Sequence, residues 1–104
     1  MQEVEQTAFE IIGSAGDALS MMMSALQYAR EGKFQEADNL MNEANTSLAK
    51  AHNAQTSLIV EESRGNKSEY SIIMVHAQDH LMNALLSQTL IGEMLHLYKR
   101  LEEK

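Results

Sequence analysis

The chain has 104 residues, of which 44% are hydrophobic and 22% charged, and it contains no proline. This composition excludes collagen-like, proline-rich and charge-dominated disordered proteins, and the length suits one domain. Fifteen acidic residues against eight basic ones give a formal charge of −7, and the basic residues are scattered, so nucleic-acid binding is not expected. The absence of cysteine excludes a disulfide framework, a thiolate zinc site and a cysteine nucleophile.

No apolar run approaches the roughly 20 residues of a membrane span. No basic-then-apolar signal segment opens the sequence either. We therefore expect a cytoplasmic protein with no direct membrane insertion.

Polar residues with glycine interrupt the helical pattern around Gly32 and around Gly65. They divide the chain into three predicted helices, roughly 3–31, 34–62 and 69–103. In the first helix, apolar spacing predicts a core face made of Phe9, Ile12, Gly16, Leu19, Met23 and Leu26. We interpret the eight methionines of the chain as core filler.

The second predicted helix carries an apolar seam with one polar member. Its residues alternate in steps of three and four: Phe34, Ala37, Met41, Ala44, Leu48, Ala51, Gln55 and Leu58. This spacing is typical of an amphipathic helix. Gln55 needs hydrogen-bond partners if it is buried, so it marks either a specificity device or the wall of a site.

The third predicted helix has two apolar stripes on nearly opposite sides. One contains Ile72, Val75, Met82, Leu86, Leu90 and Leu97, and the other contains Met74, Ala77, Leu81, Leu85 and Leu95. A three-helix monomer needs only one such face, and burying the other removes apolar surface from water. The fold class is therefore all-α, an antiparallel three-helix bundle that associates with copies of itself.

Asp79 interrupts the first of these stripes, between Val75 and Met82. A carboxylate buried there must be protonated, paired or bound to a metal. If copies of this helix meet around a symmetry axis, the Asp79 side chains converge. They then either share protons or bind a divalent cation. Because the ligands are oxygen atoms, Mg²⁺ is favoured over Zn²⁺. The alternative is that Asp79 lies at an exposed border of the helix.

His76 and His80 are four residues apart and therefore point the same way, one helical turn apart. One interpretation is half of a transition-metal site, although no third ligand follows from the spacing. Another is that one imidazole is a nucleophile that carries a covalent group. The third is a packed or solvated pair, which is also the simplest interpretation of His52 and His96.

Gln78 lies about 160° around the helix from His76. It cannot readily serve the His76 of its own chain, but it can serve that of a neighbouring chain. No glycine-rich phosphate loop, paired-carboxylate hydrolase spacing or Gly-x-Ser-x-Gly elbow is present in the sequence.

The segment from Val75 to Met82, VHAQDHLM, resembles the signature of the lactose/cellobiose-type IIA component of the bacterial phosphoenolpyruvate-dependent sugar phosphotransferase system. The resemblance covers effectively the whole chain. On the second helix it extends to Ala51, His52, Gln55, Thr56, Leu58 and Ile59, and on the first hairpin to Gly16, Ala18, Ser20, Ala25, Ala29, Gly32, Phe34 and Ala37.

This resemblance implies one IIA domain over residues 1–104 and a nine-helix homotrimer with Asp79 and a metal ion, Mg²⁺ or another divalent cation, on its axis. It implies that His76 accepts a phosphoryl group from the phosphocarrier protein HPr and passes it to a cysteine of the IIB component, while the membrane IIC component moves the sugar. His80, and Gln78 or His52 from an adjacent face, are candidates to stabilise the phosphoryl group. The sugar class is lactose, cellobiose, chitobiose or a β-glucoside.

A different class of function competes with this relay. In that alternative the chain is a helical interaction module whose His76, Asp79 and His80 bind a structural metal and nothing more.

Overall fold

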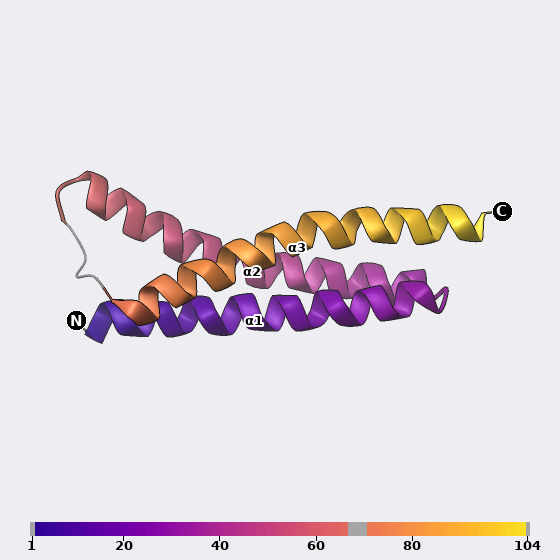
Figure 1. Cartoon of the computed structure of the whole chain (residues 1–104), viewed down its shortest axis with the longest axis horizontal. Helices are drawn as coiled ribbons and strands as arrows, with labels where there is room; N and C mark the ends of the chain where they lie inside the picture. Colours follow the sequence, from indigo (N-terminus) through magenta and orange to yellow (C-terminus); the bar gives the residue numbers. More distant parts are fainter. Residues whose placement is uncertain (1, 67–70, 104) are drawn as a thin grey trace.

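The structure, a computed structural model, describes residues 2–66 and 71–103. It contains three helices, α1 (Gln2–Arg30), α2 (Phe34–Ser63) and α3 (Ile72–Glu102). They form an elongated molecule of 56 × 20 × 18 Å in which α2 runs antiparallel to α1 and α3 (Figure 1). The predicted all-α, three-helix protomer is confirmed. Over the described ranges there is no strand and no helix long and apolar enough to cross a membrane.

Helices α1 and α2 each end at a glycine with left-handed backbone. The φ angle is +81° at Gly32 and +94° at Gly65. After α1, Lys33 N–H donates to the Tyr28 carbonyl (2.9 Å) and Gly32 N–H to the Ala29 carbonyl (3.0 Å). This pair of bonds closes a helix in the Schellman motif, and glycine adopts the required conformation without steric cost. The two glycines thus determine where these helices stop, as the sequence predicts.

Helix α3 begins later than predicted, and the reason is a cap. The predicted start at residue 69 lies outside the described residues, but Ser71 is extended (φ −148°, ψ 131°) and its side chain accepts a hydrogen bond from Met74 N–H at 3.3 Å. Serine at this position satisfies a backbone donor that the first helical turn leaves free. The other helix ends lie within one residue of their predicted positions.

Helix α1 supplies the middle of the core through small side chains, so its predicted core face was wrong in part. The buried series, spaced by three and four residues, is Ala8, Ile11, Ala15, Ala18, Met22, Ala25 and Ala29. Phe9 and Met23, expected in the core, are 62% and 55% exposed. Alanine side chains let α2 and α3 approach α1 closely, and the larger side chains of Ile12, Leu19 and Leu26 pack at the margin of this seam.

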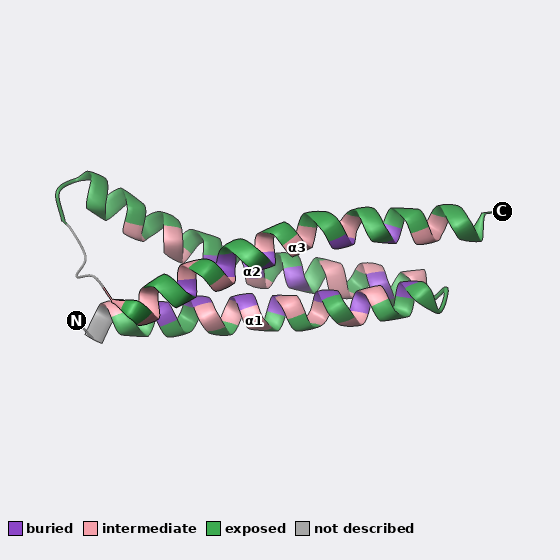
Figure 2. Ribbon diagram, viewed as in Figure 1, coloured by how far each residue is buried: buried purple, intermediate pink, exposed green. Residues whose placement is uncertain are grey.

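The predicted seam of α2 is confirmed over most of its length. Ala37, Ala44, Leu48 and Ala51 are buried, and Phe34, Met41 and Leu58 pack against them partly buried. After Leu58 every described residue up to Asn66 is exposed. In this last part α2 leads away from the other two helices, and Figure 2 shows it almost entirely in the colour of exposed residues.

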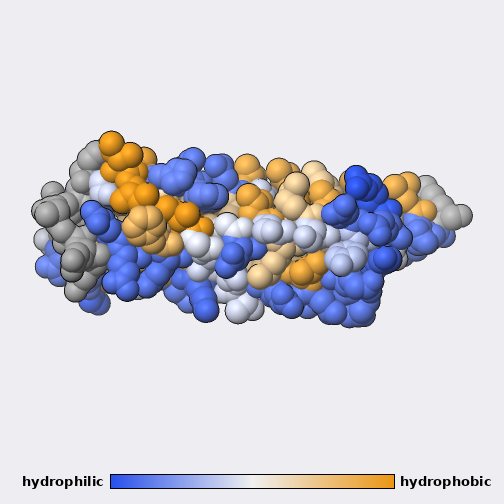
Figure 3. All heavy atoms as spheres, turned by 90° about the horizontal axis from the view of Figure 1, so that it is seen from below, coloured by the Kyte–Doolittle hydropathy of each residue, from blue (hydrophilic) through white to orange (hydrophobic). Residues whose placement is uncertain are grey.

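Helix α3 has the two predicted faces. Ala77, Leu81 and Leu95 are buried, with Met74 and Leu85 partly buried beside them. On the other face the exposed fraction runs from 49% to 78% across Ile72, Val75, Met82, Leu86, Leu90 and Leu97. Apolar side chains also reach the surface drawn in Figure 3, including a group toward the end where α1 begins. A single protomer therefore leaves one apolar stripe of α3 uncovered.

The interpretation of the methionines as core filler was correct only in part. Met22 is fully buried, and Met21, Met41 and Met74 are partly buried. Met23, Met82 and Met94 are exposed large hydrophobic residues. Sequence spacing around α1 and α3 did not separate the two groups, because apolar positions surround both helices.

Helices α2 and α3 touch each other at few places, since α1 lies against both of them. Apart from a contact to a methionine sulfur, three polar links join α2 to α3 in the described residues: Asp38 with Lys99, Asn45 with Gln88, and Gln55 with Gln78. The Lys99 Nζ lies 3.0 and 3.1 Å from the two carboxylate oxygens of Asp38. None of these links follows from the sequence, because each joins positions at least 23 residues apart.

Candidate functional site

The two histidines near the start of α3 lie together. The ring centroids of His76 and His80 are 5.4 Å apart and their planes meet at 69°, an edge-on contact. His76 is exposed, whereas His80 is partly buried. The continuous helix around them holds both rings one turn apart, as the spacing predicts. One imidazole is thus open to a reaction partner, and a second lies within reach of a group attached to it.

The position of His76 on α3 follows from the helical repeat. At about 100° per residue, His76 lies about 100° from the buried Ala77 on one side and about 60° from Asp79 on the other. Asp79 is exposed and belongs to the uncovered stripe between Val75 and Met82. His76 therefore lies at the edge between the core of its own protomer and that stripe.

Asp79 has no ion-pair or hydrogen-bond partner among the described residues. The described part of the chain contains no group of three or more His, Asp or Glu side chains that could hold a metal ion. His76, Asp79 and His80 thus do not form a metal site within one protomer. Asp79 supplies one carboxylate on the uncovered stripe, so a cation bound there would need carboxylates from further copies of the chain.

Gln78 is held by the second helix. The Nε2 of Gln55 donates a hydrogen bond to Oε1 of Gln78, and the two side chains are partly buried. Around this pair lie two thioether sulfurs, Met74 Sδ at 3.8 Å from Gln78 Nε2 and Met82 Sδ at 4.0 Å from Gln55 Nε2. Sequence reasoning singled out both glutamines and missed that they bind each other. Gln55 was singled out as the polar member of an apolar seam and Gln78 for its angle to His76, and neither feature indicates the partner.

His52 and His96 are both exposed and do not join the imidazole pair. His52 is on α2 and His96 is near the far end of α3, about 30 Å along the helix from His76 at 1.5 Å per residue. Neither makes a ring contact with another described residue. Their placement agrees with the simplest interpretation of single histidines.

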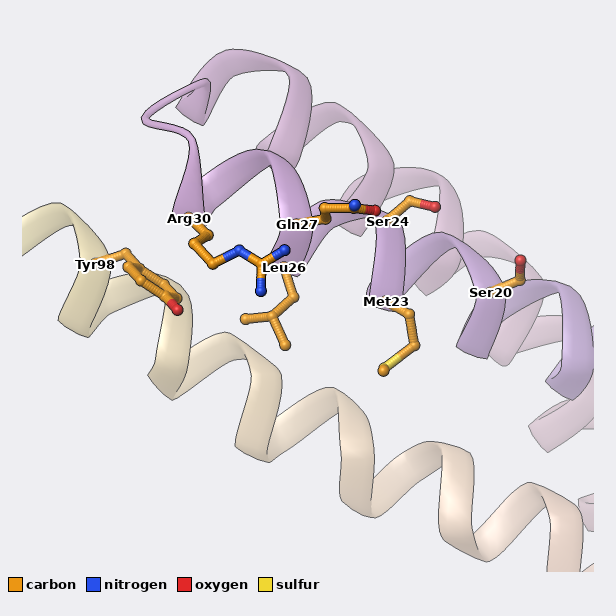
Figure 4. Close-up of a pocket in the computed structure, with 7 residues that line it drawn as sticks. All are labelled: Ser20, Met23, Ser24, Leu26, Gln27, Arg30 and Tyr98. Carbon is orange, nitrogen blue, oxygen red and sulfur yellow. The ribbon is translucent and has the colours of Figure 1, made fainter.

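A groove between α1 and α3 lies at the opposite end of the molecule from His76. It has a volume of about 550 Å³ and is lined by Ser20, Met23, Ser24, Leu26, Gln27, Arg30 and Tyr98. In Figure 4 the Arg30 guanidinium extends toward the groove between the Tyr98 ring and Leu26. The lining holds no imidazole and no carboxylate. Arg30 is the one charged residue of this lining, and none of the residues singled out from the sequence for chemistry belongs to it.

An exposed imidazole on a continuous helix, beside a second imidazole and an uncovered apolar stripe, is compatible with several functions, and comparison with known proteins identifies the family. The sequence pattern described as "PTS system, Lactose/Cellobiose specific IIA subunit" matches residues 6–99. A lactose-specific EIIA component from Staphylococcus epidermidis is 45% identical over 98 residues, covering 94% of each chain.

Solved structures agree with this match. The cellobiose-specific enzyme IIA from Bacillus anthracis superposes with a TM-score of 0.95 at 47% identity, covering 100% of this chain and 95% of the other. The IIA(Chitobiose) chain in a solved complex with HPr, from Escherichia coli, superposes with a TM-score of 0.82 at 34% identity, covering 95% and 96%. The chain belongs to the lactose/cellobiose-specific IIA family of the sugar phosphotransferase system.

Proposed function

We propose that this IIA component carries a phosphoryl group on His76, receiving it from phosphorylated HPr and donating it to a cysteine of the cognate IIB component. The observation that carries the proposal is the exposed His76 ring with the partly buried His80 ring 5.4 Å away. A related IIA has a solved complex with HPr. The sugar taken up through the membrane IIC component belongs to the lactose, cellobiose, chitobiose or β-glucoside class, and the relay operates in the cytoplasm.

Each transfer exchanges one bond to phosphorus for another. In the first step a ring nitrogen of His76 bonds to phosphorus while the bond from phosphorus to HPr breaks, its electron pair remaining on HPr. In the second step the IIB cysteine sulfur bonds to phosphorus and the electron pair of the N–P bond returns to the imidazole. Such transfers need positioning and charge stabilisation more than covalent machinery. The helix supplies the positioning.

His80 is the first candidate to stabilise the transferred group. A ring N–H of His80 is a hydrogen-bond donor, and phosphoryl oxygens are strong acceptors. Because His80 is partly buried, its ring is more restricted than that of His76. In this role His80 speeds transfer without itself becoming phosphorylated.

The working assembly in this proposal is a homotrimer of nine helices. The support is the uncovered stripe of α3, in which every large apolar side chain exposes about half of its area or more. Covering such a stripe with copies of itself removes it from water. Asp79 then lies on the shared axis, where three carboxylates would hold Mg²⁺, a cation that prefers oxygen ligands. When bound, the cation neutralises carboxylate repulsion and takes no part in phosphoryl transfer.

The test is phosphorylation with phosphoenolpyruvate and the general phosphotransferase proteins, read by intact mass and acid lability. The expected result is one acid-labile phosphoryl group per chain, absent in His76→Gln and present in His80→Gln and in the matched His52→Gln control. Uptake by His76→Gln, together with loss in either of the other variants, would assign the phosphoacceptor elsewhere. No uptake by the parent, with tight transition-metal binding, would favour the metal-binding interaction module.

A further inference from the structure

In the hydrogen bond between the Gln55 and Gln78 side chains, one amide is the donor and the other is the acceptor. Gln55 Nε2 is the donor and Gln78 Oε1 the acceptor. A glutamine side chain has one carbonyl oxygen that accepts and one NH₂ group that donates. With its oxygen engaged, Gln78 has only a weak acceptor near its NH₂ group among the described residues, the partly buried Met74 Sδ at 3.8 Å. This NH₂ group is therefore available to a stronger acceptor.

The NH₂ group of Gln78 is suited to bind a phosphoryl group. Phosphoryl oxygens on a histidine carry negative charge and accept hydrogen bonds, so an N–H attracts them and a carbonyl oxygen repels them. If the Gln78 amide were turned over, its oxygen would take the place of the NH₂ group. The hydrogen bond from Gln55 thus decides whether Gln78 is a donor or an acceptor at this surface.

The phosphoryl group in question belongs to another protomer. On α3, His76 lies about 60° to one side of Asp79, and Gln78 lies about 100° to the other side. When copies pack around a cyclic axis through the uncovered stripe, one flank of each protomer meets the opposite flank of the next. The Gln78 flank of one protomer consequently approaches the His76 flank of its neighbour.

Among the described residues Gln78 has no other hydrogen bond to α2. The residues of α2 after Leu58 are all exposed up to Ser63, and the end of this helix leads away from α3 (Figure 1). The nearest other polar link between these helices, Asn45 with Gln88, lies ten residues earlier on α2. Without Gln55, the Gln78 side chain would be free to sample several rotamers and both amide orientations. A donor that must be oriented during the reaction contributes less than one already in place.

We infer that Gln55 is a positioning residue, which holds the Gln78 amide with its NH₂ group toward the phosphoryl group on His76 of the adjacent protomer. This inference rests on the proposed phosphoryl-carrier function. It assigns a role to a residue of α2 that itself does not touch the phosphoryl group.

The first experiment measures the rate of phosphoryl uptake from phosphorylated HPr in three variants. Gln55→Glu can only accept, so it turns the Gln78 amide over, and Gln55→Met removes the donor without adding charge. Asn45→Asp is the control, because it adds a carboxylate to α2 yet still accepts the bond from Gln88. We expect Gln55→Glu to slow uptake about 10-fold to 100-fold, the effect of losing one hydrogen bond to a charged group. Gln55→Met slows it less, and Asn45→Asp matches the parent.

The second experiment separates positioning from folding by mixing subunits. Gln55→Glu protomers are reassembled with His76→Gln protomers, neither of which has a complete site alone. In mixed trimers, His76 of the first protomer meets the intact Gln55 and Gln78 of the second, so fast uptake is restored. A simple loss of fold in the Gln55→Glu protomer would not be rescued in this way.

The outcomes are distinct. If neither the parent nor Asn45→Asp takes up phosphoryl, the proposed function itself fails and this role fails with it. If both take it up and Gln55→Glu is equally fast, the positioning role is overturned and the carrier function stands. If Gln55→Glu is slow and mixing restores nothing, Gln55 does not act across the junction between protomers, which also overturns the inference.

Discussion

Replacement of Asp79 by leucine should strengthen the trimer in metal-free buffer. Asp79 is the carboxylate between Val75 and Met82 on a stripe that is otherwise apolar from Ile72 to Leu86. Three such carboxylates meeting on an axis lose hydration and repel one another, and a cation offsets this only in part. The variant Asp79→Leu makes the stripe continuous and removes the need for a cation.

The size of the effect follows from how much of the stripe the protomer leaves uncovered. Its large side chains expose 49% to 78% of their area, and complete burial of one such side chain contributes about 1.5–3 kcal/mol. A leucine covered over about half of its surface adds about 0.8–1.5 kcal/mol per protomer. Replacing buried charge by packed apolar groups is often neutral or favourable by about 1–4 kcal/mol. The expected stabilisation is therefore on the order of 1 kcal/mol per protomer.

Thermal unfolding followed by circular dichroism, with chelator and with added Mg²⁺, measures this prediction. The parent should melt lower with chelator than with Mg²⁺, while Asp79→Leu should melt above the chelated parent and be indifferent to the cation. Asp17→Leu is the control, because Asp17 is an exposed carboxylate on α1. Sedimentation equilibrium checks that each protein remains a trimer. If Asp79→Leu dissociates or melts well below the parent in both buffers, Asp79 does not lie on a shared apolar axis.

Three further predictions concern assembly, stability and transfer. Leu86→Glu should give a folded monomer in sedimentation equilibrium. Leu86 is 59% exposed in the protomer, and the added charge opposes its burial against another copy. A trimer would contradict the stripe as the interface. Gly13→Ala should raise the free energy of unfolding in urea by about 1 kcal/mol. Gly13 lies within α1, and a Cβ atom there would meet nothing within 4 Å. A loss of stability would contradict this reasoning. His80→Gln should be phosphorylated yet pass the group to the IIB component several-fold more slowly in rapid-quench assays. Unchanged transfer would remove His80 from the site.

Much of the fold could be predicted because large apolar residues recur at helical spacing. The seam of α2 and the two faces of α3 were predicted for that reason and are confirmed. In α1 the same reasoning selected Phe9 and Met23, yet the helix is buried through a seam of alanines. Hydrophobic size is a poor guide where helices pack closely, because the smallest side chains then occupy the centre of the contact.

Some features of the candidate site could be predicted from the sequence and others could not. The spacing of His76 and His80 predicts that they point the same way one turn apart, and in the structure their ring centroids are 5.4 Å apart. The pairing of Gln55 with Gln78 spans two helices and depends on where α2 leaves α3, so neither residue alone indicates it. The chemical role given to His76 came from the resemblance to a family, since an exposed histidine pair is compatible with several functions.

The sequence by itself determined the local features of this protein: two helix ends at glycines, the one-turn separation of the histidines and the second apolar stripe with its single carboxylate. These features depend on backbone conformation and helical periodicity, which act over a few residues. Only the tertiary structure decided which face of α1 is buried and which side chain Gln78 binds. Both depend on the distance and angle between helices far apart in the chain, which close packing determines and periodicity alone does not.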